Sequence, residues 1–100
     1  MHRLPELRRK IDEIDAQLVQ LLSQRAALAL EIGGIKHSAG EPVYQPAREV
    51  QVLAHVREVN PGPLDDAAIM RLFERIIDEA RRLERVADAA RAVESKERGE

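Results

Sequence analysis

LRRKIDEIDAQLVQLLSQRAALALEIGGI, residues 7–35, is the stretch of sequence that decides the fold. Its large aliphatic residues recur at alternating spacings of four and three, with one slot of the pattern taken by Arg25. The stripe consists of Leu7, Ile11, Ile14, Leu18, Leu21, Leu28, Ile32 and Ile35. A stripe sustained for about four heptads predicts one long helix with a coiled-coil-like seam. The helix should begin near Pro5, which suits a first turn, and its span to Ser38 would be about 50 Å.

A helix of this length is too long to be covered by its own chain. A compact domain of 100 residues has a radius of gyration of only about 13 Å. Gly33 and Gly34 are unfavourable inside a helix, but Ile35 keeps the seam in phase, so they predict a close approach of another helix rather than a helix end. We therefore expect the seam to pack against a partner chain.

The rest of the chain predicts two further helices. Gly40, Pro42 and Pro46 mark a loop over 39–46, a short helix follows over 47–59, and Asn60 to Pro63 interrupts the chain. Asp65 or Asp66 can cap a third helix. Its apolar set is Ile69, Leu72, Phe73, Ile76, Ile77, Ala80, Leu83 and Ala87. The fold class is therefore all-α, a three-helix chain with one long N-terminal helix that packs against a partner chain. Residues 1–90 would form the domain, and the polar residues 91–100 a helical extension or a disordered tail.

Composition excludes several classes of function. The net charge of −2 shows no basic field for nucleic acid, and the absence of cysteine removes disulfides and thiolate chemistry. Tyr44 and Phe73 are the only aromatic residues, so aliphatic side chains on helices must supply the packing. Without a signal peptide or an apolar run that would span a bilayer, the expected location is the cytoplasm.

Two basic residues stand out on the long helix. Arg25 takes a seam position, where an unpaired charge is costly unless an anion meets it. Either a ligand or a protein carboxylate could do so, or the polar residue could simply fix the helix register. Lys36 shares the face of Arg25 about 16 Å further along, so both could reach one small anion. Alternatively, Lys36 is a solvated cation near a helix end.

Three more charged residues are candidates for the same site as Arg25 and Lys36, although each has a simple alternative explanation. Arg8 lies about 25 Å before Arg25 along the helix, so only an antiparallel partner helix could bring it to the Lys36 end. On its own, Arg8 would be a surface residue. Glu49 and Glu84 fall on the apolar faces of the second and third helices, where each could be a simple flank of the stripe. Taken together, these inward charges favour function, because burying each of them is expensive.

The sequence contains no motif that would indicate a metal site or a catalytic nucleophile. His2, His37 and His55 show no metal-binding spacing, and the serines lack a nucleophile elbow. We expect no cofactor and no metal.

In order along the chain, six motifs resemble those of AroQ-type chorismate mutases, and the match covers about residues 4–86. They are LRRKID (7–12), LLSQR (21–25), EIGGIK (31–36), PVY (42–44), RE (48–49) and IMRLFERII (69–77). The resemblance implies an intertwined dimer with two shared sites, which rearranges chorismate to prephenate for phenylalanine and tyrosine biosynthesis.

The resemblance also implies residue roles. Arg8 looks like the arginine donated by the second subunit, and Arg25 like the arginine that meets a substrate carboxylate. Lys36 matches the lysine near the breaking ether bond, and Glu49 the carboxylate that accepts from the ring hydroxyl. Glu84 falls where the family carries Gln or Glu facing the ether oxygen.

Arg48 corresponds to an arginine beside these residues in the family's site. The sequence differs from the family pattern at two positions. Gln45 takes a substrate-contacting loop position that is acidic in some relatives, and Ala80 replaces a small hydroxyl residue. The residues suit a unimolecular rearrangement of a dianion, which needs folding of the substrate and stabilisation of charge on its ether oxygen, but no nucleophile. Lys36 and a protonated Glu84 would be the donors to that oxygen.

Two other functions stay open on the sequence alone. Isochorismate pyruvate lyase resembles this family in fold and in much of its site. A non-catalytic helical dimerisation or regulatory module, acting on another enzyme of aromatic biosynthesis, is compatible with the charged tail. Feedback by Phe or Tyr and the identity of a pathway partner are not encoded in any motif.

Overall fold

The computed structural model describes residues 3–42 and 45–97, and it contains three helices in these ranges. They are α1 (Leu4–Ala39), α2 (Pro46–Val59) and α3 (Asp66–Glu97). The predicted all-α, three-helix chain with a long first helix is thereby confirmed. Val43 and Tyr44 of the predicted loop, His2, and residues 98–100 of the tail lie outside the described residues.

Gly40, rather than the Gly33-Gly34 pair, ends α1. Its φ of 72° lies in the left-handed region, which favours glycine. The Gly40 N–H donates to the His37 carbonyl at 3.2 Å, and the Glu41 N–H donates to the Lys36 carbonyl at 2.8 Å. These bonds satisfy carbonyls that the last helical turn leaves without intrahelical partners. Gly33 and Gly34 are therefore interior helix residues, as the seam predicted.

Side-chain hydrogen bonds order the turn between α2 and α3. The Asn60 amide donates to the Leu64 carbonyl at 2.7 Å and to the Asp66 carboxylate at 3.1 Å, and its oxygen accepts from the Gly62 N–H at 3.0 Å. Asp65 then caps α3, because its carboxylate accepts from the Ala68 N–H at 2.7 Å. Of the two predicted capping residues, Asp65 is the one that caps.

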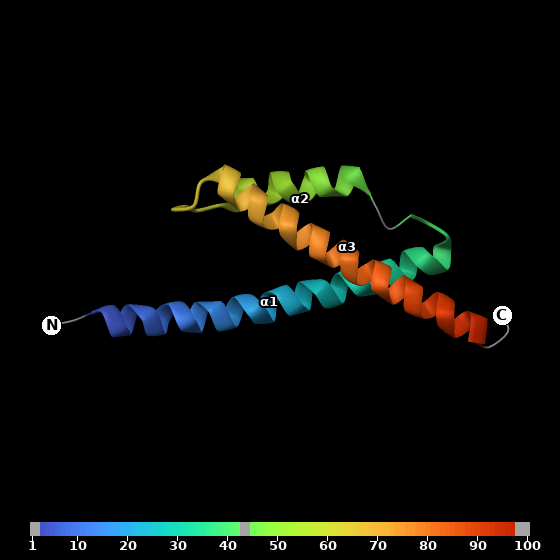
Figure 1. Cartoon of the computed structure of the whole chain (residues 1–100). Helices are drawn as coiled ribbons and strands as arrows, with labels where there is room; N and C mark the ends of the chain where they lie inside the picture. The colour runs from blue at the N-terminus through green and yellow to red at the C-terminus, as the bar shows by residue number, and fades with distance from the viewer. Residues whose placement is uncertain (1–2, 43–44, 98–100) are drawn as a thin grey trace.

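α3 packs against both of the other helices and crosses α1 near the C-terminal part of α1 (Figure 1). The N-terminal half of α1 projects away from this crossing (Figure 1). The chain is accordingly elongated, with principal extents of 69 × 28 × 15 Å and a radius of gyration of 18.1 Å. A compact domain of this length would measure about 13 Å.

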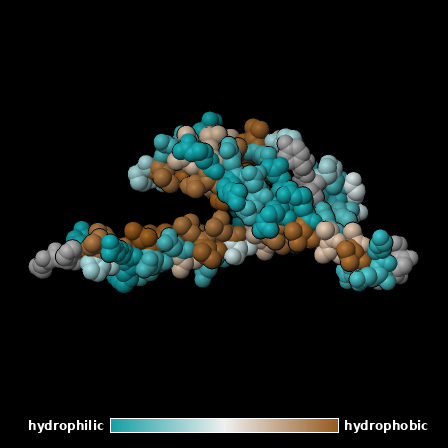
Figure 2. Space-filling view, viewed as in Figure 1, coloured by the Kyte–Doolittle hydropathy of each residue, from teal (hydrophilic) through white to brown (hydrophobic). Residues whose placement is uncertain are grey.

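The described chain leaves most of its large aliphatic side chains exposed. Val56, at 8% exposure, is its only buried hydrophobic residue among those described. The seam of α1 is open to solvent, from Leu7 at 42% to Ile35 at 66%. Figure 2 shows hydrophobic surface on the projecting part of α1 and on the nearby underside of the α2–α3 pair. Burying a side chain of this kind contributes about 1.5–3 kcal/mol, so much stabilisation is unrealised in the single chain.

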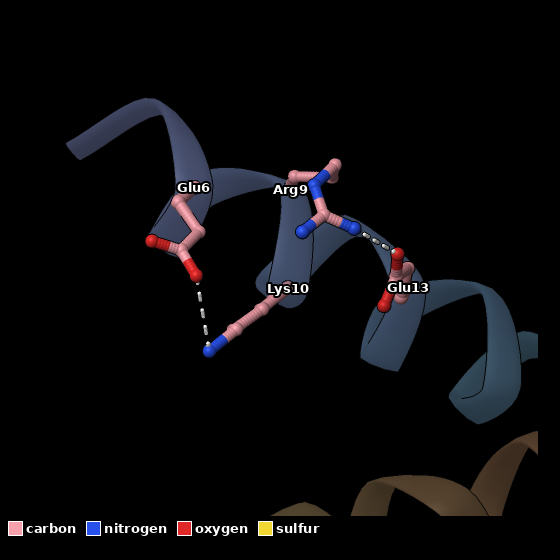
Figure 3. A network of polar contacts seen from close by, with 4 residues as sticks. All are labelled: Glu6, Arg9, Lys10 and Glu13. Atoms are coloured by element: carbon pink, nitrogen blue, oxygen red, sulfur yellow. Dashed lines mark hydrogen bonds and ion pairs between the residues drawn. The ribbon is translucent and has the colours of Figure 1, made fainter. Parts of the chain in front are cut away.

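The polar side of the projecting segment carries two ion pairs within α1 (Figure 3). Arg9 pairs with Glu13 at 2.8 Å and Lys10 with Glu6 at 3.6 Å, each one helical turn apart. Exposed pairs at this spacing contribute only about 0.3–0.5 kcal/mol each. They therefore support the helix locally without replacing a core.

The C-terminal tail is helical as far as it is described, because α3 continues without a break to Glu97. The Arg91 side chain approaches Gly34, where its Nη1 would lie 3.9 Å from an added Cβ. A domain boundary near residue 90 stays a prediction. In the described ranges, no helix combines the length and apolar character that crossing a bilayer requires.

Candidate active site

A cavity of about 320 Å³ lies where the three helices meet. This volume falls within the range of pockets that hold small molecules, about 300–1,000 Å³. α1 supplies Arg25, Leu28, Ala29, Ile32 and Lys36; α2 and the residue before it supply Gln45, Arg48, Glu49 and Val52; α3 supplies Ile77, Ala80, Arg81 and Glu84. The wall is therefore aliphatic, with charged groups from every helix.

Six of the seven sequence-predicted site residues line this cavity. They are Arg25, Lys36, Gln45, Arg48, Glu49 and Glu84. Arg8 does not line it, because α1 is one unbroken helix that keeps Arg8 about 25 Å from Arg25 along its axis. Arg8 can therefore reach such a cavity only on another copy of the chain.

The cations enter the cavity from two helices. Arg25 is half-buried on α1, and the Lys36 side chain is only 17% exposed, with its Nζ 4.0 Å from a Glu41 carboxylate oxygen. Arg48, near the start of α2, donates to the Gln51 side chain at 3.4 Å. Arginine guanidinium groups bind carboxylates bidentately, so the cavity is suited to a small molecule that carries more than one carboxylate.

Glu84 faces Lys36 and Gly33 at the crossing of α1 and α3. Gly33 is buried, and a Cβ added there would lie 3.3 Å from the Glu84 Cγ, so the absence of a side chain makes room for this glutamate. Burial raises the pKa of the Glu84 carboxyl, and the negative charge of Asp88 raises it further, against the opposing influence of Arg81 and Lys36. Burial and the charge of Asp88 together outweigh the two cations, so the pKa of Glu84 lies above its ordinary value.

Arg81 is a cavity residue that the sequence reasoning missed. Its Nη2 lies 2.9 Å from Oε1 of Glu49, a contact that joins α3 to α2, and 2.7 Å from Oδ1 of Asp78. A signal was present, since Ile77, Ala80, Arg81 and Glu84 follow helical spacing on one face. The pairing with Glu49 could not be predicted, because it depends on how α2 and α3 are placed against each other.

Behind Glu84, a second group of charged residues joins the C-terminal part of α3 to α1. Asp88 lies 3.7 Å from His37 Nδ1 and pairs with Arg91 on its own helix. Neither this group nor any other set of three His, Asp or Glu side chains in residues 3–42 and 45–97 is arranged to hold a metal ion.

Comparison with known proteins identifies the family. The profile described as chorismate mutase type II matches residues 7–85. The chorismate mutase of Thermus thermophilus (form II) superposes with a TM-score of 0.82 at 37% sequence identity, covering 84% of this chain and 96% of that one.

Curated relatives agree with this comparison. The bifunctional chorismate mutase/prephenate dehydratase of Neisseria gonorrhoeae is 42% identical over 78 residues, which are 78% of this chain and 21% of that protein. The chorismate mutase of Methanocaldococcus jannaschii is 29% identical over 86 residues, 85% of this chain and 87% of that one. The chain thus spans about a fifth to a quarter of the bifunctional relatives it matches.

The fold and the cavity define an all-helical protein in which three helices line one charged cavity of small-molecule size. The chain belongs to the chorismate mutase type II family.

Proposed function

We propose that the chain is a chorismate mutase, which converts chorismate to prephenate by an intramolecular [3,3] rearrangement without cofactor, metal or covalent intermediate. The observation that carries the proposal is the gathering of Arg25, Lys36, Arg48, Glu49 and Glu84 around one cavity of small-molecule size. These are the charged types that a dianion with a hydroxyl and an ether oxygen requires, and they come from three separate helices.

The mechanism needs binding and electrostatics rather than a nucleophile. Arg25 and Arg48 hold the substrate carboxylates and select the folded conformer in which the bond-forming carbons are close, which removes an entropic part of the barrier. As the ether bond breaks, negative charge grows on its oxygen. Lys36 and the protonated Glu84 donate to that oxygen and stabilise the transition state more than the ground state.

Glu49 acts on another part of the substrate in this scheme. Its carboxylate accepts a hydrogen bond from the ring hydroxyl and so fixes the orientation of the ring. Gln45 provides a neutral polar contact at the start of α2. In the proposed dimer, covering the exposed aliphatic residues of the wall would exclude water and strengthen these charged interactions.

The proposal includes a homodimer with two shared sites. It is supported by the exposed seam of α1 and by the distance of Arg8 from the cavity of its own chain. A two-fold axis would place each Arg8 near the cavity of the other subunit, where it would be an additional clamp on a carboxylate. The cytoplasmic location expected from the sequence stays a prediction.

The test is turnover by the purified chain. Chorismate should disappear and prephenate should appear in equal amount, in a protein that sediments as a dimer, and Arg25→Ala should abolish the reaction. A folded dimer with no turnover would overturn the proposal in favour of a non-catalytic module. Release of pyruvate from isochorismate, with chorismate left intact, would instead indicate a lyase.

A further inference from the structure

Arg81 joins two walls of the cavity through one guanidinium group. From α3 it reaches the Glu49 carboxylate of α2 at 2.9 Å, and it lines the cavity itself. Its second carboxylate partner, Asp78, lies on its own helix and faces outward with 58% of its side chain exposed. The guanidinium is thus anchored on the outside by Asp78 and meets Glu49 at the cavity.

The Arg81–Glu49 pair is partly shielded from water. The side chains of Arg81 and Glu49 are 31% and 25% exposed, whereas the pairs on the projecting part of α1 are about half exposed or more. Reduced exposure weakens screening by solvent and salt, so this pair fixes geometry better than a surface pair does. Arginine also stays charged at every relevant pH.

The geometry leaves Glu49 able to bind a second group. Arg81 engages Oε1, and a carboxylate has two oxygens that together accept several hydrogen bonds. Oε2 can therefore accept from a substrate hydroxyl while Oε1 is held. A carboxylate restrained in this way loses less conformational freedom when the hydroxyl binds.

We propose that Arg81 is a positioning residue, which holds the Glu49 carboxylate at the cavity wall in the orientation that receives the hydroxyl of the bound substrate. The inference rests on the proposed function for the identity of that hydroxyl, but the restraint on Glu49 is a property of the protein itself.

Arg81 also acts on Glu84, the other carboxyl group that lines the cavity. The groups around Glu84 are Lys36 from α1, Arg81 and Asp88 from α3, and, through Arg81, Glu49 from α2. Arg81 lowers the pKa of Glu84, although burial and Asp88 prevail and keep it raised. Loss of the Arg81 charge should therefore raise the Glu84 pKa further, which supplies a readout separate from Glu49.

The kinetic test compares Arg81→Gln, Glu49→Gln and the double variant with chorismate as substrate, at a pH below the decline of the parent profile, where the changed pKa of Glu84 does not contribute. Arg81→Gln should lower kcat/KM about tenfold, as expected for losing one hydrogen bond to a charged group. The loss should appear mainly in KM, because the hydroxyl is bound in the ground state and the transition state alike. The double variant should be no worse than Glu49→Gln alone, since Arg81 acts through Glu49. Arg81→Lys keeps the charge and should recover most of the loss.

Arg85→Gln is the matched control. It removes the same charge from an exposed position on the same helix, outside the cavity wall, and should leave kcat/KM unchanged. Losses that add in the double variant would show that Arg81 does not work through Glu49 and would overturn the proposal. An Arg81→Gln enzyme as active as the parent would do so as well.

A measurement that needs no turnover separates this inference from the proposed function. In ¹³C spectra of the carboxyl-labelled protein, the Glu49 signal at neutral pH should shift in Arg81→Gln and stay in place in Arg85→Gln. The Glu84 signal should titrate at higher pH in Arg81→Gln than in the parent. Unchanged Glu49 and Glu84 signals in a folded Arg81→Gln protein would overturn the positioning role, whether or not the parent turns over chorismate.

Discussion

Gly33 of α1 lies directly against Glu84 of α3, so close that a Cβ on the glycine would stand 3.3 Å from the glutamate Cγ. The contact couples the packing of the two helices to the placement of the carboxyl group that is proposed to donate to the ether oxygen. Helix stability favours a side chain at position 33, whereas the placement of Glu84 favours glycine. Substitutions at this position can therefore separate the effect on stability from the effect on catalysis.

Gly33→Ala should lower kcat/KM without an equal loss of stability. Alanine is favoured over glycine inside a helix by about 1 kcal/mol, which offsets the crowding of a flexible side chain. The Glu84 side chain would have to move by a few tenths of an ångström away from its alignment with the ether oxygen. Because a misplacement of about 1 Å can reduce a rate a hundredfold, we expect a smaller but measurable loss. Thermal unfolding and steady-state kinetics measure the two effects.

Gly34→Ala provides the control for this substitution. The nearest atom to its added Cβ is Nη1 of Arg91 at 3.9 Å, an ordinary van der Waals contact. The variant should gain helix propensity and keep its activity. Equal activity losses at both glycines would show that the helix, rather than Glu84, is responsible.

The raised pKa of Glu84 predicts a pH dependence. A protonated Glu84 donates to the ether oxygen, whereas an ionised carboxylate repels the charge that develops there. We expect kcat/KM to decline as pH rises through this pKa, which burial and Asp88 hold above its ordinary value. Glu84→Gln, a permanent donor of similar shape, should flatten the profile. If Glu84→Gln is inactive at every pH, or keeps the profile of the parent, Glu84 is not the donor and Lys36 remains as the principal one.

Asp88→Asn should move the same profile in the opposite direction to Arg81→Gln. The charge of Asp88 raises the Glu84 pKa, so removing it should let that pKa fall and make the decline in activity begin at lower pH. The groups that face Asp88 are His37 from α1 and Glu84 and Arg91 from α3. His37→Gln, measured beside it, controls for loss of the contact to α1. A profile unmoved by Asp88→Asn would remove this carboxylate from the electrostatics of the site.

The shared site predicts complementation between two inactive variants. Arg8→Ala and Arg25→Ala should each be nearly inactive, because each lacks one arginine at both sites of the dimer. Refolding them together in equal amounts should yield heterodimers in which one of the two sites is intact, and about a quarter of the parent activity for random pairing. Mixtures no more active than the separate variants would place both arginines in the site of one chain, or neither in catalysis.

The sequence predicted those features that depend on local spacing. The four-and-three alternation from Leu7 to Ile35 predicted α1 through Gly33 and Gly34, and the motif order predicted which charged residues to look for. Arg25, Lys36, Glu49 and Glu84 line one cavity.

Features that depend on the contact between two helices could not be predicted in the same way. Arg81 had the spacing of a cavity residue, but its ion pair with Glu49 follows from the placement of α2 beside α3. The balance at Glu84 was equally out of reach, since Lys36 and burial act in opposite directions and only the packing against Gly33 and Asp88 decides between them. Sequence spacing determines which residues share a helix face. The net effect of neighbouring charges on a pKa also depends on the distances between residues of different helices, which spacing does not give.

In the proposed homodimer, the exposed seam of α1 would make folding depend on protein concentration. Val56 is the one buried hydrophobic residue among those described. The proposed association would cover most of the remaining apolar surface, and unfolding and dissociation would then become a single equilibrium. The melting temperature should then rise with total protein, and dilution should lower activity per chain along with helix content. Specific activity is normally independent of enzyme concentration. For such a chain it would instead report the fraction of chains that are associated.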